Sequence, residues 1–155
     1  MQRFAAIRNS SVQDDADQRG KLAYVTQLDV RWGDMDALGH VNNAVYFRYI
    51  EQARIEFFEE SGIASDGKGH GMLLVHADCN FRRAIVYPAR IELRLYCGEA
   101  RRSSLPLFVE IVDARDANVL YADGKSVVAW VDFALNQSQL MPDAVRARFA
   151  AAKVG

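Results

Sequence analysis

The sequence contains few of the residues from which disulfide frameworks and metal sites are built. Only two of its 155 residues are cysteines, Cys79 and Cys97, and they are not arranged as CxxC. Both lie in apolar segments, which favours reduced thiols packed in a core. The three histidines, His40, His70 and His76, lack a ligand spacing such as HExxH. We therefore expect neither a disulfide nor a metal site.

The chain also lacks an excess of either charge and lacks long apolar runs. Its 19 basic residues are balanced by 20 acidic residues, whereas a nucleic-acid-binding surface needs a basic excess. No apolar run approaches the roughly 18 residues that a membrane helix requires. The first 20 residues contain no apolar stretch long enough for a signal peptide. These absences predict a cytoplasmic protein that binds neither nucleic acid nor a membrane.

Patterning divides the chain into an extension and one domain. Residues 1–20 are polar, lack periodicity and carry an acidic cluster, so we expect a flexible N-terminal extension. Residues 21–155 have the length of a single globular domain.

The spacing of apolar residues predicts one strand, one long helix and then a run of strands. Alternation over 22–32 indicates a half-buried strand. A helix is predicted after the N-cap Asn42, with apolar residues around most of its circumference, and Gly62 ends it. Four more strands are predicted over 72–83, 89–97, 105–114 and 119–133, and a short helix follows over 143–152.

This order of elements predicts an α+β fold. The short gaps between the last four strands are typical of antiparallel neighbours. A single helix that is apolar on most sides needs a curved antiparallel sheet wrapped around it, because a flat sheet would cover only one stripe.

Polar reactive groups are concentrated at the N-terminus of the long helix. Asp34 and Asp36 lie in a short turn, and a glycine, a histidine and two asparagines follow at once. Aspartate in a turn is usually structural. A helix N-terminus, however, presents free N–H groups and the positive end of the helix dipole, which suit a developing oxyanion. This turn is the best candidate for a reactive site.

The run WGDMDALGHVNNAVYFRYIEQAR, residues 32–54, resembles a known signature, D-x-D-x-x-G-[HV]-V-N-N-x-x-Y. This signature belongs to the hotdog-fold acyl-CoA thioesterases of the 4-hydroxybenzoyl-CoA thioesterase family. The order of predicted elements is similar to that of the hotdog fold. The resemblance implies hydrolysis of an acyl-CoA to a free acid and CoA without metal or cofactor. One branch, linked to the Tol–Pal system, has a histidine at the position of Asn43, so the role of that histidine is not carried over.

The resemblance also implies roles for individual residues. Asp36 matches the catalytic carboxylate, and backbone N–H groups around Asn43 would hold the thioester carbonyl. Asp36 could attack the carbonyl or deprotonate a water, and the sequence does not choose between these. His40 could orient water or simply complete the turn. Asn42 is expected to cap the helix and touch substrate, and Tyr46 to line the substrate pocket.

The nucleotide of CoA carries phosphates, so basic side chains are expected near the pocket mouth. Family members use a turn that corresponds here to Arg101, Arg102, Ser103 and Ser104. Arg82 and Arg83 are second choices. His76 and Asp78 share the apolar face of a predicted strand, which favours a buried hydrogen-bonded pair, and Glu51 with Arg54 forms a helical i, i+3 pair.

One small sheet leaves its edge strands unpaired, and joining two copies would cover them, so we expect a homodimer or homotetramer. The main alternative is a non-hydrolytic module that binds acyl-CoA or an acyl carrier. A serine hydrolase is rejected because no GxSxG elbow is present.

Overall fold

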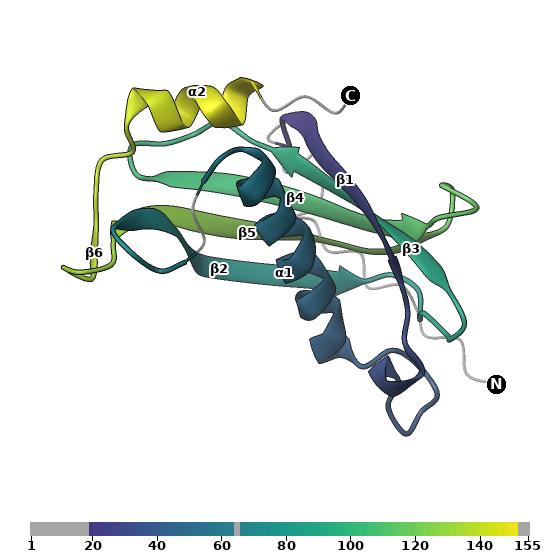
Figure 1. Ribbon diagram of the computed structural model, residues 1–155. Helices are drawn as coiled ribbons and strands as arrows, with labels where there is room; N and C mark the ends of the chain where they lie inside the picture. Colours follow the sequence, from purple (N-terminus) through teal and green to yellow (C-terminus); the bar gives the residue numbers. More distant parts are fainter. Residues whose placement is uncertain (1–18, 64–65, 152–155) are drawn as a thin grey trace.

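The computed structural model describes residues 19–63 and 66–151, which form a six-stranded antiparallel sheet and two α-helices (Figure 1). The predicted flexible extension, 1–20, lies outside the described residues except for its last two. The elements in chain order are β1 (Lys21–Asp29), the 3-10 helix η2 (Trp32–Asp34), α1 (Asn43–Glu60), β2 (His70–Phe81), β3 (Arg90–Cys97), β4 (Ser104–Asp113), β5 (Leu120–Asp132), β6 (Gln137–Ser138) and α2 (Asp143–Ala151).

The strands are ordered β1-β3-β4-β5-β2, with β6 paired to the end of β5. All pairs are antiparallel, as the short connections predicted. β1 and β2 therefore lie at opposite edges, although only η2 and α1 separate them in the sequence. The two-residue strand β6 was not predicted, because it is too short to show a period.

The core lies between α1 and one face of the sheet. Strict alternation in β3 buries Ile91, Leu93 and Leu95. Seven residues of α1 are buried, and they are Tyr46, Tyr49, Ile50, Ala53, Arg54, Phe57 and Phe58. Asn42 caps the helix as predicted, since its Oδ1 accepts from the N–H of Ala44 at 2.9 Å.

The predicted strand 22–32 is longer than β1. β1 ends at Asp29, and Trp32 begins η2 with 73% of its surface exposed. A register shift between Leu22 and Tyr24 leaves Ala23 as an extra residue, and Ala23 is buried. A β-bulge of this kind reverses the alternation locally.

α2 closes one end of the core. Phe149 packs against Phe57 and Phe58 of α1, with ring centroids 5.7 Å and 6.0 Å apart. The loop between η2 and α1 lies at the far end of α1, away from α2 (Figure 1). The two ends of the molecule therefore carry different structures, and the predicted reactive turn lies at the end without α2.

Candidate active site

The turn that contains Asp36 is closed by its own backbone. The N–H of Asp36 donates to the carbonyl of His40 (2.8 Å), and the N–H of Gly39 donates to the carbonyl of Asp36 (3.0 Å). Gly39 has a φ of 75°, in the left-handed region that favours glycine. Oδ1 of Asp36 accepts from the N–H of Leu38 at 2.9 Å. Within the described residues the other carboxylate oxygen accepts no hydrogen bond, so half of the carboxylate is open to a ligand.

Two further hydrogen bonds fix this turn to the rest of the molecule. The N–H of Val41 donates to the carbonyl of Ile85 and the N–H of Asn42 to the carbonyl of Asp34, each at 2.9 Å. The segment that follows β2 therefore lies directly against the start of α1.

The start of α1 has one free amide rather than several. The sequence predicts unpaired N–H groups over 42–45. Asn42 donates to Asp34, Ala44 donates to the Asn42 side chain, and Val45 donates to the carbonyl of Asn42 at 2.8 Å. In the part of the chain that the structure describes, only the N–H of Asn43 in this stretch has no acceptor. A single donor at the positive end of the helix dipole is thus available to an incoming oxygen.

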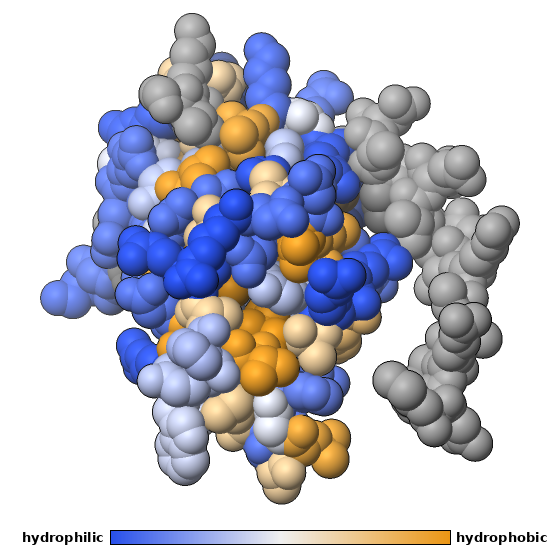
Figure 2. Space-filling model, turned by 90° about the vertical axis from the view of Figure 1, so that its right-hand side faces the viewer, coloured by the Kyte–Doolittle hydropathy of each residue, from blue (hydrophilic) through white to orange (hydrophobic). Residues whose placement is uncertain are grey.

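Six of the predicted residues line one pocket of about 230 Å³, and they are Asp36, His40, Asn43, Tyr46 and the second choices Arg82 and Arg83. The remaining lining comes from Leu38, Val41, Phe81 and Ala84. On this side of the molecule apolar side chains gather at the surface between hydrophilic ones (Figure 2). Asn42 does not line the pocket and acts as the helix cap.

Phe81 and Ala84 were not predicted at this site. They lie at and just beyond the end of β2, and nothing local in the sequence marks them as neighbours of the turn. The hydrogen bond from Val41 to Ile85 is what brings this segment to the pocket.

Tyr46 forms the floor of the pocket and is 2% exposed. Its hydroxyl donates to the carbonyl of Arg83 at 3.4 Å and accepts from the N–H of Ile85 at 3.3 Å. Burial raises the pKa of the Tyr46 phenol, so the hydroxyl stays protonated at neutral pH. Its ring meets Phe81 edge to face at 5.0 Å. Tyr46 therefore presents an aromatic wall to the pocket and uses its hydroxyl to hold the segment after β2.

The first aspartate of the turn, Asp34, has a structural environment. Oδ2 of Asp34 accepts from the hydroxyl of Tyr49 at 2.6 Å and from the N–H of Arg31 at 2.9 Å. Burial and the Asp34 carboxylate together raise the pKa of the Tyr49 phenol strongly. Asp34 ties the turn to α1 and does not line the pocket.

The two arginines at the pocket rim differ in their partners. The guanidinium of Arg82 forms a two-pronged ion pair with Asp123, with distances of 2.7 Å and 3.1 Å. Arg83 makes no side-chain hydrogen bond or ion pair within the described residues. Arg83 is therefore the rim cation that remains available to an anionic ligand.

Arg101, Arg102, Ser103 and Ser104 lie away from this pocket. Ser104 is paired with Ala129 of β5, whereas Phe81 at the pocket is paired with Ala122. The interval from 122 to 129 spans seven residues, or about 23 Å at 3.3 Å per residue. Within one chain the structure does not bring this turn to Asp36.

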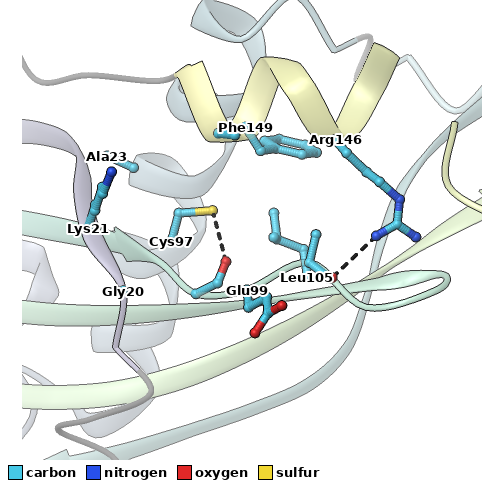
Figure 3. A pocket seen from close by; sticks show the side chains of 11 residues that line it. Gly20, Lys21, Ala23, Cys97, Glu99, Leu105, Arg146 and Phe149 are labelled. Atoms are coloured by element: carbon cyan, nitrogen blue, oxygen red, sulfur yellow. Dashed lines mark hydrogen bonds between the residues drawn. The ribbon is translucent and has the colours of Figure 1, made fainter. Parts of the chain in front are cut away.

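A separate pocket of about 300 Å³ lies between α2 and the start of β1, next to that turn (Figure 3). Arg146 lines it but donates to the carbonyls of Met141, Ala100 and Arg102. Burial raises the pKa of the Cys97 thiol to about 11, and that thiol donates to the carbonyl of Gly98 at 3.7 Å. Arg146 and Cys97 are thus occupied in holding the fold.

The predicted pair of His76 and Asp78 forms, but the prediction that it is buried is wrong. The side chains are hydrogen-bonded, with Nε2 of His76 3.0 Å from Oδ2 of Asp78, but both are exposed. A register shift between Leu74 and His76 reverses the alternation of β2 and turns both side chains outward. The predicted pair of Glu51 with Arg54 is also wrong, because Glu51 pairs with Arg48 instead.

No cluster of three or more potential metal ligands occurs among the described residues. Neither helix within 19–63 and 66–151 is both long and apolar enough to cross a membrane.

Comparison with known proteins identifies the family. The family model of the thioesterase-like superfamily matches residues 30–149. The chain belongs to this superfamily. The match covers every element from η2 to most of α2 and includes the whole pocket around Asp36.

Two solved structures are similar to this thioesterase-like chain. The PA2801 protein from Pseudomonas aeruginosa, named "a putative Thioesterase", is 37% identical, with a TM-score of 0.78 over 82% of this chain and 98% of that one. A protein from Xanthomonas campestris, named "a putative acyl-CoA thioesterase", is 34% identical, with a TM-score of 0.69 over 78% of this chain and all of that one (100%).

The uncharacterized protein YsmA of Bacillus subtilis is 30% identical over 86 residues, which are 56% of this chain and 58% of that protein. These similarities support a hotdog-type fold and thioester hydrolysis as the general activity of this chain.

Proposed function

We propose that this chain is an acyl-CoA thioesterase of the 4-hydroxybenzoyl-CoA thioesterase type, in which α1 is the central helix of the hotdog. The observation that carries the proposal is the pocket shared by the Asp36 carboxylate and the unpaired N–H of Asn43. A thioester bound there would meet a base or nucleophile on one side of its carbonyl and a hydrogen-bond donor on the other.

In the proposed reaction the carbonyl oxygen accepts from the N–H of Asn43. The helix dipole stabilises the negative charge that develops on this oxygen when the carbonyl carbon is attacked. Either Asp36 takes a proton from a water whose oxygen bonds to the carbon, or its carboxylate bonds to the carbon and water later cleaves the anhydride. In both cases the carbon–sulfur bond breaks and CoA leaves as the thiol. His40, which also lines the pocket, would orient the water.

The substrate would be held by groups on both sides of the reacting carbonyl. Tyr46 and Phe81 offer an aromatic wall for the acyl group, and Asn42 supports this site by capping α1. Arg83 is the available cation at the rim. We keep Arg101, Arg102, Ser103 and Ser104 as a proposed nucleotide site for a substrate held by another subunit, because they lie far from the pocket of their own chain. No metal or cofactor takes part in the proposed reaction.

The test is thiol release from a panel of short, long and aromatic acyl-CoAs by the wild type and by Asp36→Asn. The amide keeps an acceptor for the N–H of Leu38, so the turn is retained while the charge is lost. We expect the rate to fall by about a hundredfold or more. Equal rates for both proteins would refute the role of Asp36. Acyl-CoA binding without hydrolysis of any panel member by the wild type would favour the non-hydrolytic binding module.

A further inference from the structure

Arg54 is a charged residue buried in the middle of the molecule. Only 6% of its surface is exposed, and it lies on α1 among aromatic and aliphatic side chains. Burial lowers the pKa of its guanidinium, and the nearby Glu51 carboxylate opposes this effect. Arginine nevertheless stays protonated in proteins. A full positive charge is therefore held at a largely buried position.

This charge has no ion-pair partner of its own. Within the described residues no carboxylate forms an ion pair with Arg54, and its side chain forms no hydrogen bond. Glu51 is engaged with Arg48. Asp78 accepts from the N–H of Lys125 at 3.0 Å and is hydrogen-bonded to His76. A buried charge without a partner is costly, which points to an anion that arrives with a ligand.

Arg54 lines a pocket of about 130 Å³ between α1 and β2. Phe47, Ile50, Leu74 and Ala77 supply its apolar walls. Buried Ser126, the ion-paired Arg48 and Glu51, and Asp78 complete the lining. Within the described residues, Arg54 is the lining cation without an ion-pair partner.

This pocket and the candidate active site lie along the same two elements. Four residues of α1 have the spacing of one helix face, namely Asn43, Phe47, Glu51 and Arg54. Asn43 lines the candidate active site, and the other three line the Arg54 pocket. On the sheet side, Phe81 belongs to the first pocket and Leu74 to the second. These are two separate pockets, and we call the surface that runs along α1 and β2 from Asn43 and Phe81 to Arg54 and Leu74 the α1–β2 groove.

Helix geometry fixes the length of this groove. Eleven residues separate Asn43 from Arg54, or about 16 Å at 1.5 Å per residue. A long side chain on a helix leans back toward the N-terminus by about one turn, which brings the guanidinium to roughly 11 Å from the free amide. A short or medium-length acyl group can bridge this distance, and a long fatty chain would overrun it.

We propose that the α1–β2 groove holds the acyl group and that Arg54 binds a carboxylate at its distal end. The substrates would then be CoA monothioesters of short to medium-length dicarboxylic acids. A planar guanidinium matches a carboxylate with two parallel hydrogen bonds. This inference rests on the proposed function, because the groove is measured from the thioester position at Asn43.

The test compares substrates that differ only at the distal end. Adipoyl-CoA is paired with hexanoyl-CoA and suberoyl-CoA with octanoyl-CoA, and kcat/KM is measured for the wild type, Arg54→Met and Arg54→Lys. We expect the wild type to prefer the dicarboxylic member of at least one pair by tenfold or more. Arg54→Met should lose this preference, because the rate with the dicarboxylic substrate falls far more than the rate with the methyl-ended one. Arg54→Lys should restore part of the preference. Arg115→Met, at an exposed loop arginine, is the matched control and should keep the wild-type ratio.

Several results would overturn the inference. One is a wild type that prefers the methyl-ended substrates of both pairs. Another is an Arg54→Met variant that slows both members of a pair equally, because a structural role affects both. A third is an Arg54→Met variant that changes the oligomeric state and leaves the ratio unchanged, since the groove would then be an interface between copies. If Arg54→Met does not fold, free adipate and free hexanoate are compared as inhibitors of acyl-CoA hydrolysis by the wild type. Stronger inhibition by adipate supports the inference, and equal inhibition refutes it.

Failure of the proposed function would look different. In that case no acyl-CoA is hydrolysed in an Asp36-dependent manner. Calorimetric binding of adipoyl-CoA and hexanoyl-CoA to the wild type and Arg54→Met would still report on the groove. Tighter binding of adipoyl-CoA that depends on Arg54 supports the inference, and equal binding of the two ligands refutes it.

Discussion

Asp34 and Asp36 are two residues apart and have the same side chain, yet their neighbours differ. Asp34 is enclosed by Tyr49 and the backbone of Arg31, whereas Asp36 lines a pocket with one carboxylate oxygen open. The sequence places both in a turn and favours Asp36 only through the family resemblance. The distinguishing partner, Tyr49, lies fifteen residues downstream and reaches Asp34 only when α1 forms.

The first prediction concerns Asp34. Asp34→Ala removes the acceptor of the Tyr49 hydroxyl and should lower the free energy of unfolding by about 1–3 kcal/mol. Urea unfolding followed by circular dichroism measures this loss. Tyr49→Phe is the matched control, because it removes the same hydrogen bond from the other side and should also destabilise. If Asp34→Ala lowers the hydrolysis rate as much as Asp36→Asn with unchanged stability, the structural role of Asp34 is wrong.

At the scale of elements, regular alternation was predictable and its interruptions were not. β3 follows strict period two and lies within the predicted strand 89–97. In β2, Met72 and Cys79 both pack against the core although seven residues separate them. The bulge after Leu74 makes this possible and turns His76 and Asp78 outward. A bulge depends on the partner strand, so a pattern read along one strand cannot reveal it.

The second prediction concerns the contact between β2 and β5. A Cβ at Gly124 would lie 2.3 Å from the carbonyl oxygen of Asp78, which is backbone and cannot move aside cheaply. Gly124→Ala should therefore separate the two strands and lower the free energy of unfolding by about 2–3 kcal/mol. Differential scanning calorimetry measures the loss. Gly33→Ala is the matched control, because a Cβ there meets nothing within 4 Å and should leave stability nearly unchanged. Equal melting temperatures for the two variants would contradict the prediction.

At the scale of the whole molecule, the strand order decides which predicted residues can meet. The α+β class, the antiparallel sheet and the longer elements were predicted because each leaves a local signal. The separation of Arg101–Arg102 from Asp36 was not, because it follows from β2 lying beside β5 at one edge and β1 at the other. Which strands become neighbours depends on contacts between residues far apart in the chain.

The exposed edge of the sheet leads to the third prediction. Among the described strands β2 is paired only with β5, and three adjacent apolar residues on it are exposed, namely Leu73, Leu74 and Val75. We propose that two copies join along this edge. A charge in the middle of it, as in Val75→Lys, should convert a dimer into a monomer, which light scattering coupled to size-exclusion chromatography measures.

The control for the edge prediction is another exposed apolar residue. Leu135 is 61% exposed, close to the 57% of Val75, but lies in the turn after β5. Leu135→Lys should leave the oligomeric state unchanged. A wild type that elutes as a monomer, or a Val75→Lys variant that stays dimeric, would contradict pairing along β2.

The unbroken course of α1 over Asn43–Glu60 has a consequence for selectivity. A helix has a fixed rise per residue, so the distance between two side chains on one of its faces is fixed, and a ligand bound by both must match it. This distance changes only in steps of about one turn, because side chains return to the same face at that interval. Moving the cationic side chain by one turn would reset the preferred ligand by about 5 Å and leave the reacting end untouched.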